Sequence, residues 1–382
     1  MLKLAVLSMS MLIISFVSVA GVFPTLINDL GLTQMQSEMM MTIPALAVII
    51  FIFASNIIVY KLGIKKTVLL GMLVSGVGGI FPFFLRSFIP ILVSRFFLGA
   101  GVGIVNTWAV RYITLLFDKE ERASLMGFRA SAEIIGQMFI TITASLLFNF
   151  GWRWSFLAYG VAFISTILII IFVPDVELSQ NMYTGSNKIK LPFVIYLMVI
   201  FSGLIVLTGA GIAFRFPAIA TQIYGAQYNP NIMMILWPLL SIAASLSFGK
   251  VSDILGKKLL YLALLILIAA AFLAGFSNGN YIMLVIALFL HGVVPAWLFP
   301  FIFITISKFT TGKEQSIAFS YIVIGIKSGV FLIPFAFNFV ETLLMTDDLT
   351  TPYPVLGAGL IMAFIFILTI GKKMVHNEIK KA

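Results

Sequence analysis

Twelve apolar runs, each long enough to cross a lipid bilayer as a helix, divide this chain between short polar segments. A transmembrane helix needs roughly 20 consecutive, mainly apolar residues. The runs fall at about 4–27, 38–60, 67–86, 89–116, 123–148, 155–173, 192–214, 231–250, 259–276, 281–307, 315–340 and 355–371. The sequence therefore predicts an all-α membrane protein with twelve transmembrane helices.

The composition agrees with a lipid-facing surface. Hydrophobic residues make up 61% of the chain and charged residues 10%, whereas soluble domains carry roughly 25% charged residues. The chain has no cysteine and two histidines, which excludes a disulfide framework, thiol chemistry and a His-rich metal site. The spans also contain no paired aspartates and the chain has no P-loop. We therefore expect that the protein has no cofactor, does not use ATP hydrolysis to power transport and has no enzymatic activity.

The direction of the spans follows from the lysines and arginines. With the N-terminus placed in the cytoplasm, 17 of the 24 basic residues fall in cytoplasmic segments. Three fall at outer edges, namely Arg86, Arg153 and Arg215. The remaining four lie inside spans: Arg95, Arg111, Arg129 and Lys327. This bias predicts cytoplasmic N- and C-termini, and it explains the net charge of +10 without a nucleic-acid partner.

The first run has some features of a secretory signal peptide. Lys3 precedes the apolar stretch, and Ser18-Val19-Ala20 is similar to a cleavage site. The run is nevertheless long for a signal sequence, and its removal would leave eleven spans. We expect it to be retained as the first span.

An internal repeat divides the spans into two groups of six. The segment after the second run, 61–66, matches the segment after the eighth run, 253–258, and the two glycines are Gly63 and Gly256. The longest polar segment lies between the groups, near the middle of the chain. The sequence thus predicts an N-terminal six-helix bundle at 1–173, a cytoplasmic linker at 174–191, and a C-terminal six-helix bundle at 192–382 that ends in a short basic tail.

At several of these positions the chain resembles the major facilitator superfamily (MFS) of secondary transporters. The loop after the eighth span has the family's pattern of a glycine, an aspartate four residues later, a second glycine and a basic pair. Other similarities are Arg95 followed by the glycines of 99–103, the Gly151–Trp154 turn, and Arg122 with Gly127. The resemblance implies the MFS fold of two six-helix bundles and a conformational gating role for Gly249, Asp253, Gly256, Lys257, Lys258, Gly63 and Lys65.

The chain also departs from the family pattern. The first-half loop has Tyr60 where the family has aspartate and Asn56 where it has glycine. The fifth span has no proline, whereas proton-driven drug antiporters of the family have a Gly-Pro pair there. The departure disfavours a drug antiporter. The glycines at 99–103 are similar to half of a dinucleotide fingerprint, but inside a span they indicate close helix packing.

Ionisable residues inside spans are the candidates for function, because each costs about 2.5–3.5 kcal/mol on insertion scales. Lys327 and His291 are expected near the bilayer midplane. Arg129 and Glu133 are four residues apart on one helix face. We predict a substrate-binding set and a coupling pair: Lys327, Arg129, Arg111 and His291 for substrate, and Glu133 and Arg95 for coupling.

Each of these residues also has a structural interpretation. Glu133 is as well explained by a fixed ion pair with Arg129 or Arg111 as by a proton site. Lys327 is either a substrate-facing cation or a lysine paired with an acceptor elsewhere. His291 is either a proton relay or a hydrogen-bonded core histidine. Arg95 is equally consistent with coupling and with packing.

The functional prediction is a secondary active transporter in the cytoplasmic membrane. The surplus of Arg111, Arg129 and Lys327 over Glu133 favours a small organic or inorganic anion as the substrate. One alternative is a proton-coupled exporter of hydrophobic drugs or lipids, and another is a membrane receptor or scaffold that transports nothing. The expected partners are a small-molecule substrate, a proton and the lipid bilayer, and the chain is expected to function as a monomer.

Overall fold

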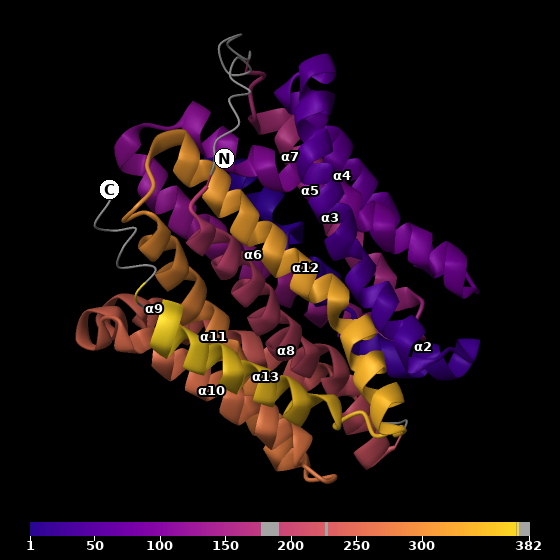
Figure 1. The fold of residues 1–382 in the computed structure, drawn as a ribbon. Helices are drawn as coiled ribbons and strands as arrows, with labels where there is room; N and C mark the ends of the chain where they lie inside the picture. Colours follow the sequence, from indigo (N-terminus) through magenta and orange to yellow (C-terminus); the bar gives the residue numbers. More distant parts are fainter. Residues whose placement is uncertain (177–190, 226–227, 372, 374–382) are drawn as a thin grey trace. The chain divides into compact units, whose positions relative to one another are not determined.

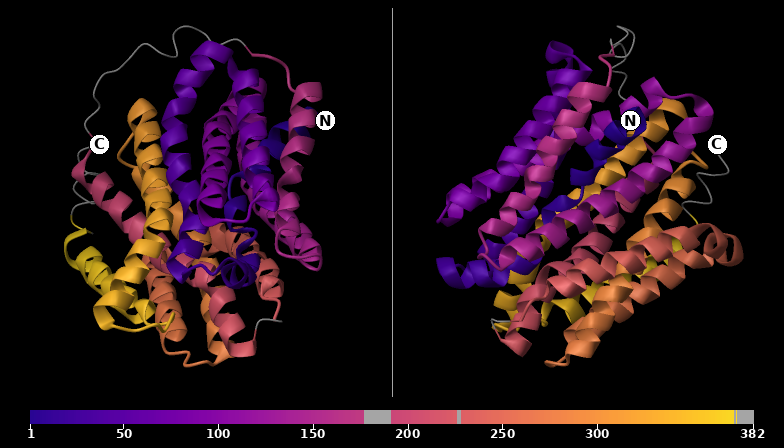
Figure 2. Two further views of the ribbon diagram at one scale, coloured as in Figure 1. Left: turned by 90° about the vertical axis from the view of Figure 1, so that its right-hand side faces the viewer. Right: turned by 180° about the vertical axis from the view of Figure 1, so that it is seen from behind.

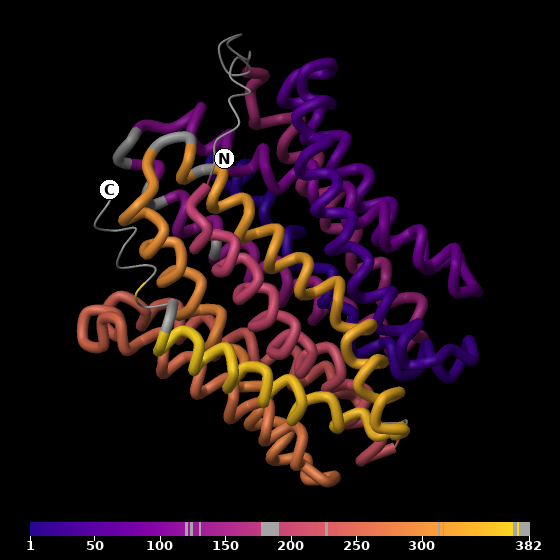
Figure 3. Tube along the Cα trace, in the orientation of Figure 1, coloured from indigo at the N-terminus to yellow at the C-terminus, as the bar shows by residue number. Residues whose placement is uncertain are grey.

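The fold is described by a computed structural model that places residues 1–176, 191–225, 228–371 and 373. The regular structure of these residues is helical, without strands. The chain divides into two compact units, Met1–Ser186 and Asn187–Ala382. In the colours of Figures 1 and 3 the first unit runs from indigo to magenta and the second continues to yellow.

The described residues contain eleven helices that are long and apolar enough to cross a membrane. A twelfth span results if the bent pair Leu2–Leu12 and Ser15–Leu30 is counted as one. The all-helical membrane fold predicted from the sequence is thus confirmed. The predicted linker at 174–191 and the predicted basic tail lie largely outside the described residues.

The first span is broken rather than continuous, and this corrects the prediction of one uninterrupted helix. It consists of α1 (Leu2–Ser8), η1 (Met9–Leu12), η2 (Ser15–Val17), η3 (Ala20–Val22) and α2 (Phe23–Leu30), with a bend of 51°. Ser8 and Ser15 donate their hydroxyls to the carbonyls of Ala5 and Leu12, both at 2.8 Å. Such local bonds compete with the helical ladder and favour tighter turns and bends.

The other spans of the first unit each contain a longer α-helix than the first span does. They are α3 (Gln34–Leu62), α4 (Ile64–Ile80) with η4 (Phe81–Phe84), α5 (Phe88–Leu116), α6 (Lys119–Phe148), and η5 (Trp154–Gly160) with α7 (Val161–Phe172). They run side by side in both views of Figure 2. A Cβ on Gly99 would lie 2.2 Å from the Pro44 carbonyl oxygen, and one on Gly101 would lie 2.3 Å from the Gly71 carbonyl oxygen. The glycines of α5 therefore permit close packing on α3 and α4, as the sequence predicts.

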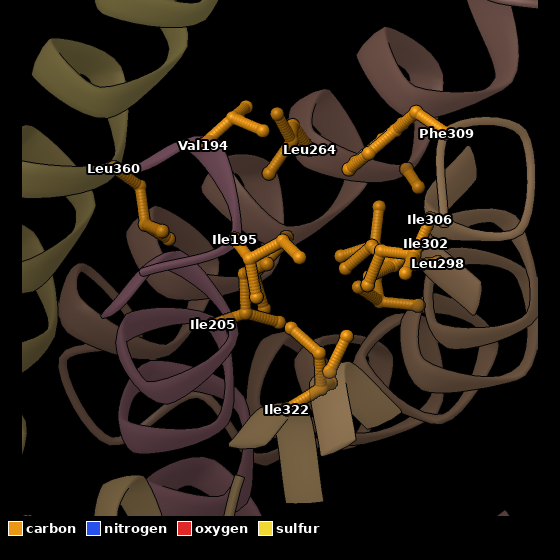
Figure 4. Close-up of a cluster of buried hydrophobic side chains, with 14 of the residues drawn as sticks. Val194, Ile195, Ile205, Leu264, Leu298, Ile302, Ile306, Phe309, Ile322 and Leu360 are labelled. Carbon is orange, nitrogen blue, oxygen red and sulfur yellow. The ribbon is translucent and has the colours of Figure 1, made fainter. Parts of the chain in front are cut away.

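The second unit contains α8 (Phe193–Tyr224), α9 (Asn231–Leu255), α10 (Lys258–Gly275), α11 (Tyr281–Ile306), α12 (Gly312–Leu344) and α13 (Pro352–Phe366), which continues as a π-helical turn, Ile367–Gly371. Aliphatic side chains fill its interior (Figure 4), with Ile195 from α8, Leu264 from α10, Leu298 from α11 and Ile322 from α12 among them. This core holds together the helices that carry the polar residues of the unit.

Candidate functional site

The charged residues of α5 and α6 form a polar cluster inside the first unit. Arg129 Nη2 lies 2.9 Å from Glu133 Oε1 and donates to Asn106 Oδ1 at 2.9 Å. The side chains of Arg129 and Glu133 are each 18% exposed. The i,i+4 spacing predicted this pair, but nothing in the sequence indicated Asn106 as the second partner. Because the carboxylate neutralises the guanidinium at close range, Arg129 adds little to a positive surplus.

Arg111 lies on α5, packed against an aromatic ring. Its Cζ atom is 4.7 Å from the ring centroid of Trp108, which is fully buried. The indole nitrogen of Trp108 and the hydroxyl of Tyr112 are buried and have no hydrogen-bond partner among the described residues. A cation over the face of an indole ring is stabilised by the electrons of the ring.

Arg95 is fully buried and binds the broken first span. It donates from Nη2 to the Phe16 carbonyl at 2.5 Å, from Nε to the Met40 carbonyl at 3.1 Å, and from Nη1 to the Tyr159 hydroxyl at 2.9 Å. Tyr159 in turn donates to the Ser15 carbonyl at 2.9 Å. Arg95 thus binds the Phe16 carbonyl at the break and the Met40 carbonyl, which lacks its helical partner because Pro44 has no N–H. The coupling role of Arg95 stays a prediction. Its observed contacts join the first span to α3 and η5, an arrangement called the Arg95 clamp below.

In the second unit, His291 is at the centre of a small polar group. Its ring is 6% exposed and its centroid lies 5.6 Å from that of Trp237, on α9. A Cβ on Gly209 would lie 2.5 Å from His291 Nδ1, so a glycine in α8 is required to admit the ring. A Cβ on Gly292 would lie 2.9 Å from Ser241 Oγ. Helices α8, α9 and α11 thus meet around the imidazole.

This group contains three buried polar atoms with no hydrogen-bond partner among the described residues. They are His291 Nδ1, Trp237 Nε1 and Ser241 Oγ. A buried polar atom without a partner is expensive, so each such atom in a native fold needs an explanation. The three lie on adjacent helices and combine a hydroxyl, an indole N–H and an imidazole beside an aromatic face. That combination suits a ligand with hydroxyl groups, since pockets for small molecules pair aromatic walls with a few polar groups.

Lys327 lies near the middle of α12 and is 8% exposed. Gly325 and Gly329 flank it and form the contact with α8. At 100° per residue, Lys327 is on the helix face opposite to these glycines. The sequence predicted that Lys327 lies inside a span, and its low exposure agrees with that prediction. Its predicted role in substrate binding stays a prediction.

The loops of the gating motif are helix ends shaped by glycine. Gly63 has φ of +78° and ends α3, and Gly256 has φ of +49° and ends α9. Residues other than glycine rarely adopt positive φ angles. Lys65 Nζ donates to the Ile170 carbonyl, at the end of α7, at 3.0 Å. Of the other predicted residues of the second-half motif, Gly249 and Asp253 lie in the last two turns of α9, Lys257 lies between the helices, and Lys258 begins α10.

Two charged residues differ from the sequence prediction. Arg215, counted among the outer-edge cations, is 1% exposed inside α8 and is paired with Glu341 of α12. It also donates to the Leu349 carbonyl at 3.0 Å. Glu38 is fully buried in α3 and accepts a hydrogen bond from Gln34 at 2.9 Å. Glu133 is therefore not the one buried acid, and the charge balance is less positive than the sequence suggested.

The described residues contain no group of three or more His, Asp or Glu side chains arranged to hold a metal ion.

The family model described as Major Facilitator Superfamily matches residues 5–237. An uncharacterized protein of Campylobacter jejuni is 28% identical over 160 residues, which are 42% of this chain and 50% of that protein. The galactose-proton symporter of Escherichia coli K12 is 25% identical over 162 residues, which are 41% of this chain and 34% of the symporter. The matched segments thus span half or less of these curated relatives.

Solved structures with the same fold cover nearly the whole chain. A D-xylose-proton symporter aligns with a TM-score of 0.73 at 15% identity and covers 96% of both chains. The nucleoside transporter NupG aligns with a TM-score of 0.76 at 12% identity, over 96% of this chain and 99% of that one. At these identities the likeness shows the fold alone.

Proposed function

Because the chain belongs to the Major Facilitator Superfamily, we propose that it is a secondary active transporter that moves a small polar solute across the cytoplasmic membrane. Membership of this transporter family agrees with the expectation that the chain is not an enzyme. Transport would proceed by alternating access, in which the two bundles rock around a site near the midplane. One chain supplies both six-helix bundles, so we propose that it acts as a monomer.

The proposed substrate is a neutral solute with several hydroxyl groups, such as a monosaccharide or a nucleoside. The observation that carries this proposal is the set of unpartnered polar atoms on His291, Trp237 and Ser241. These groups donate and accept hydrogen bonds without a net charge, and the indole ring offers an apolar face. The printed names of the galactose and xylose symporters and of the nucleoside transporter name solutes of the same chemistry.

An anionic substrate is the alternative, and Lys327 is the observation that favours it. A buried lysine inside a membrane span is expensive and therefore marks a candidate functional position. Neither Arg129, which is paired with Glu133, nor Arg215, which is paired with Glu341, adds a charge that would attract an anion. Export of hydrophobic drugs or lipids would use neither Lys327 nor the polar group around His291.

For energy coupling we propose the pair of Arg129 and Glu133. Protonation of Glu133 would release Arg129, which would then keep its bond to Asn106. A proton site inside a span beside a competing cation is a common arrangement in transporters. The loops with Gly63, Lys65 and the motif 249–258 are proposed to control the exchange between conformations.

A thermal-shift screen of the detergent-purified protein tests the substrate class. Monosaccharides, nucleosides and small carboxylates are added separately, and a ligand at 100 times its Kd should add about 2.7 kcal/mol of stability. We expect Trp237→Phe to abolish the shift from hydroxyl-bearing ligands. The ligand-free variant should be as stable as the wild type or more so, because the removed N–H has no hydrogen-bond partner in the part of the chain that the structure describes.

Trp297→Phe is the matched control for this experiment. Trp297 lies on the same helix as His291, but its indole N–H donates to the Ala244 carbonyl at 2.9 Å and to Ser247 Oγ at 3.3 Å. Its substitution should lower stability by about 1 kcal/mol and leave the ligand shift intact. If carboxylates alone stabilise the protein and Lys327→Met removes their effect, the neutral-solute proposal is wrong and the anion alternative replaces it.

A further inference from the structure

One end of the first unit has an aromatic pocket with two arginines that the transport proposal does not use. It has a volume of about 560 Å³ and lies where α2 ends, where η4 leads into α5, and where α6 turns into η5. Its walls include Asp29, Arg86, Trp152, Arg153 and Trp154. With the predicted cytoplasmic termini, this end of the unit is at the outer surface of the membrane.

The charges of the pocket are unbalanced in favour of an anion. The carboxylate of Asp29 accepts the indole N–H of Trp152 at 2.8 Å and lies 3.8 Å from Arg153 Nη2. Arg153 Nε is buried and has no hydrogen-bond partner among the described residues. Arg86 is exposed at the rim. The pocket is thus lined by two guanidinium groups and by one carboxylate that is already bound, and guanidinium groups bind phosphate with particular strength.

The aromatic residues place this pocket at the boundary between lipid and water. Trp154 is 43% exposed, and its ring centroid lies 5.2 Å from that of Phe83. The Phe84 ring is 67% exposed and packs 4.9 Å from Phe83. Tryptophan side chains are enriched where lipid headgroups meet the hydrocarbon. We therefore expect the two arginines to lie near the level of the lipid phosphates.

An apolar groove continues from the pocket along the same span. It has a volume of about 380 Å³ and lies between α4 and α5, with Leu73, Val77 and Phe81 on one side and Phe97 on the other. Phe81 lines the groove and its ring centroid lies 6.2 Å from that of Phe84, which lines the aromatic pocket. The groove and the pocket are thus joined by one turn of helix.

From these two adjoining sites we propose that the first unit binds one anionic phospholipid, with its phosphate at Arg86 and Arg153 and an acyl chain in the groove. The pocket supplies the charge for a phosphate, and the groove supplies an apolar channel that a water-soluble anion would not fill. A zwitterionic lipid has the same acyl chains, but its cationic headgroup would meet two arginines. The site is separate from the polar group around His291.

Native mass spectrometry of the purified full chain tests the proposal. The protein is titrated with phosphatidylglycerol or phosphatidylcholine that carry identical acyl chains. We expect the wild type to bind one phosphatidylglycerol at least tenfold more tightly than phosphatidylcholine. The double variant Arg86→Gln/Arg153→Gln should lose this preference. Arg86 is exposed, so Arg86→Gln alone should keep the fold and weaken phosphatidylglycerol binding at least threefold.

Two further variants separate this site from general lipid adhesion. Val77→Trp places a large side chain in the groove and should weaken binding at least fivefold while both arginines remain. Lys66→Gln removes an exposed cation at the opposite end of α4 and should change affinity less than twofold. Equal binding of the two lipids, or equal losses in Lys66→Gln and Arg86→Gln, would overturn the proposal. Competition by glycerol phosphate at the same concentrations as the lipid would also overturn it and indicate a soluble anion site.

Discussion

Arg95 is bound by oxygen atoms on three separate spans, and no carboxylate is among them. Its donors reach the carbonyls of Phe16 and Met40 and the hydroxyl of Tyr159. A planar guanidinium is suited to such a set because its donors point in fixed and different directions. The residue therefore stabilises the break in the first span and connects it to α3 and η5.

We predict that Arg95→Lys destabilises the protein even though it keeps the charge. A single ammonium group cannot replace donors that point to three partners, and each buried acceptor left unpaired costs about 1–3 kcal/mol. Tyr159→Phe removes only the bonds of one hydroxyl and should cost about 1 kcal/mol. Thermal unfolding of the detergent-purified variants measures both effects. Wild-type stability in Arg95→Lys would show that the clamp is unimportant.

Residues differ in how far the sequence could predict them. Arg129 and Glu133 were predictable as a pair because helix geometry places them together. The ion pair of Arg215 with Glu341 was not, since these residues are 126 positions apart and no local pattern connects them. The same holds for His291 and Trp237, which meet only because α9 and α11 pack together. The contacts that define the candidate site are mostly of this second kind.

At the scale of elements, α8 and α12 are held together by glycines. A Cβ on Gly325 would lie 2.4 Å from the Val199 carbonyl oxygen, and one on Gly329 would lie 2.2 Å from the Gly203 carbonyl oxygen. Backbone contact of this kind is typical of helix pairs in membranes, where dispersion replaces the hydrophobic effect between helices. Lys327 lies between the two glycines in the sequence, so this contact fixes its position.

We predict that Gly329→Ala destabilises the second unit, although alanine is the better helix former. The added methyl group would require a backbone shift, and overpacking of this kind costs about 1–3 kcal/mol. Gly359→Ala, on α13, is the matched control because a Cβ there has no neighbour within 4 Å. It should be neutral or stabilising by up to about 1 kcal/mol. Equal thermal stabilities of the two variants would contradict the proposed contact.

Apolar runs predicted where the spans lie but not their internal form. An apolar run of a given length and hydropathy can form either a straight helix or a broken span such as the first one. The break depends on serine hydroxyls that bond to nearby carbonyls and on Arg95 and Tyr159, which come from other spans. The glycine run of α5 was easier to interpret, because small residues inside a span indicate close packing by themselves.

For the whole molecule, the sequence predicted the class and the family of the fold. Twelve apolar runs predicted the class, and the motif at 249–258, Arg95 with the glycines of 99–103, the Gly151–Trp154 turn and Arg122 with Gly127 together indicated the family. The favoured substrate was less well predicted, because counting charges treats every arginine as available. In the fold, Arg129 is paired with Glu133, and the polar atoms around His291 that have no partner among the described residues belong to an imidazole, an indole and a hydroxyl.

The most direct test of the account is uptake into proteoliposomes under an imposed proton gradient. Labelled monosaccharides and nucleosides are supplied outside, and accumulation is followed with and without a protonophore. We expect at least one of them to accumulate above its external concentration, and the protonophore should abolish this accumulation. Glu133→Gln should still exchange the solute across the membrane but should no longer concentrate it. If the folded wild type takes up none of these solutes faster than empty liposomes, the account of a proton-coupled carrier of neutral solutes is contradicted.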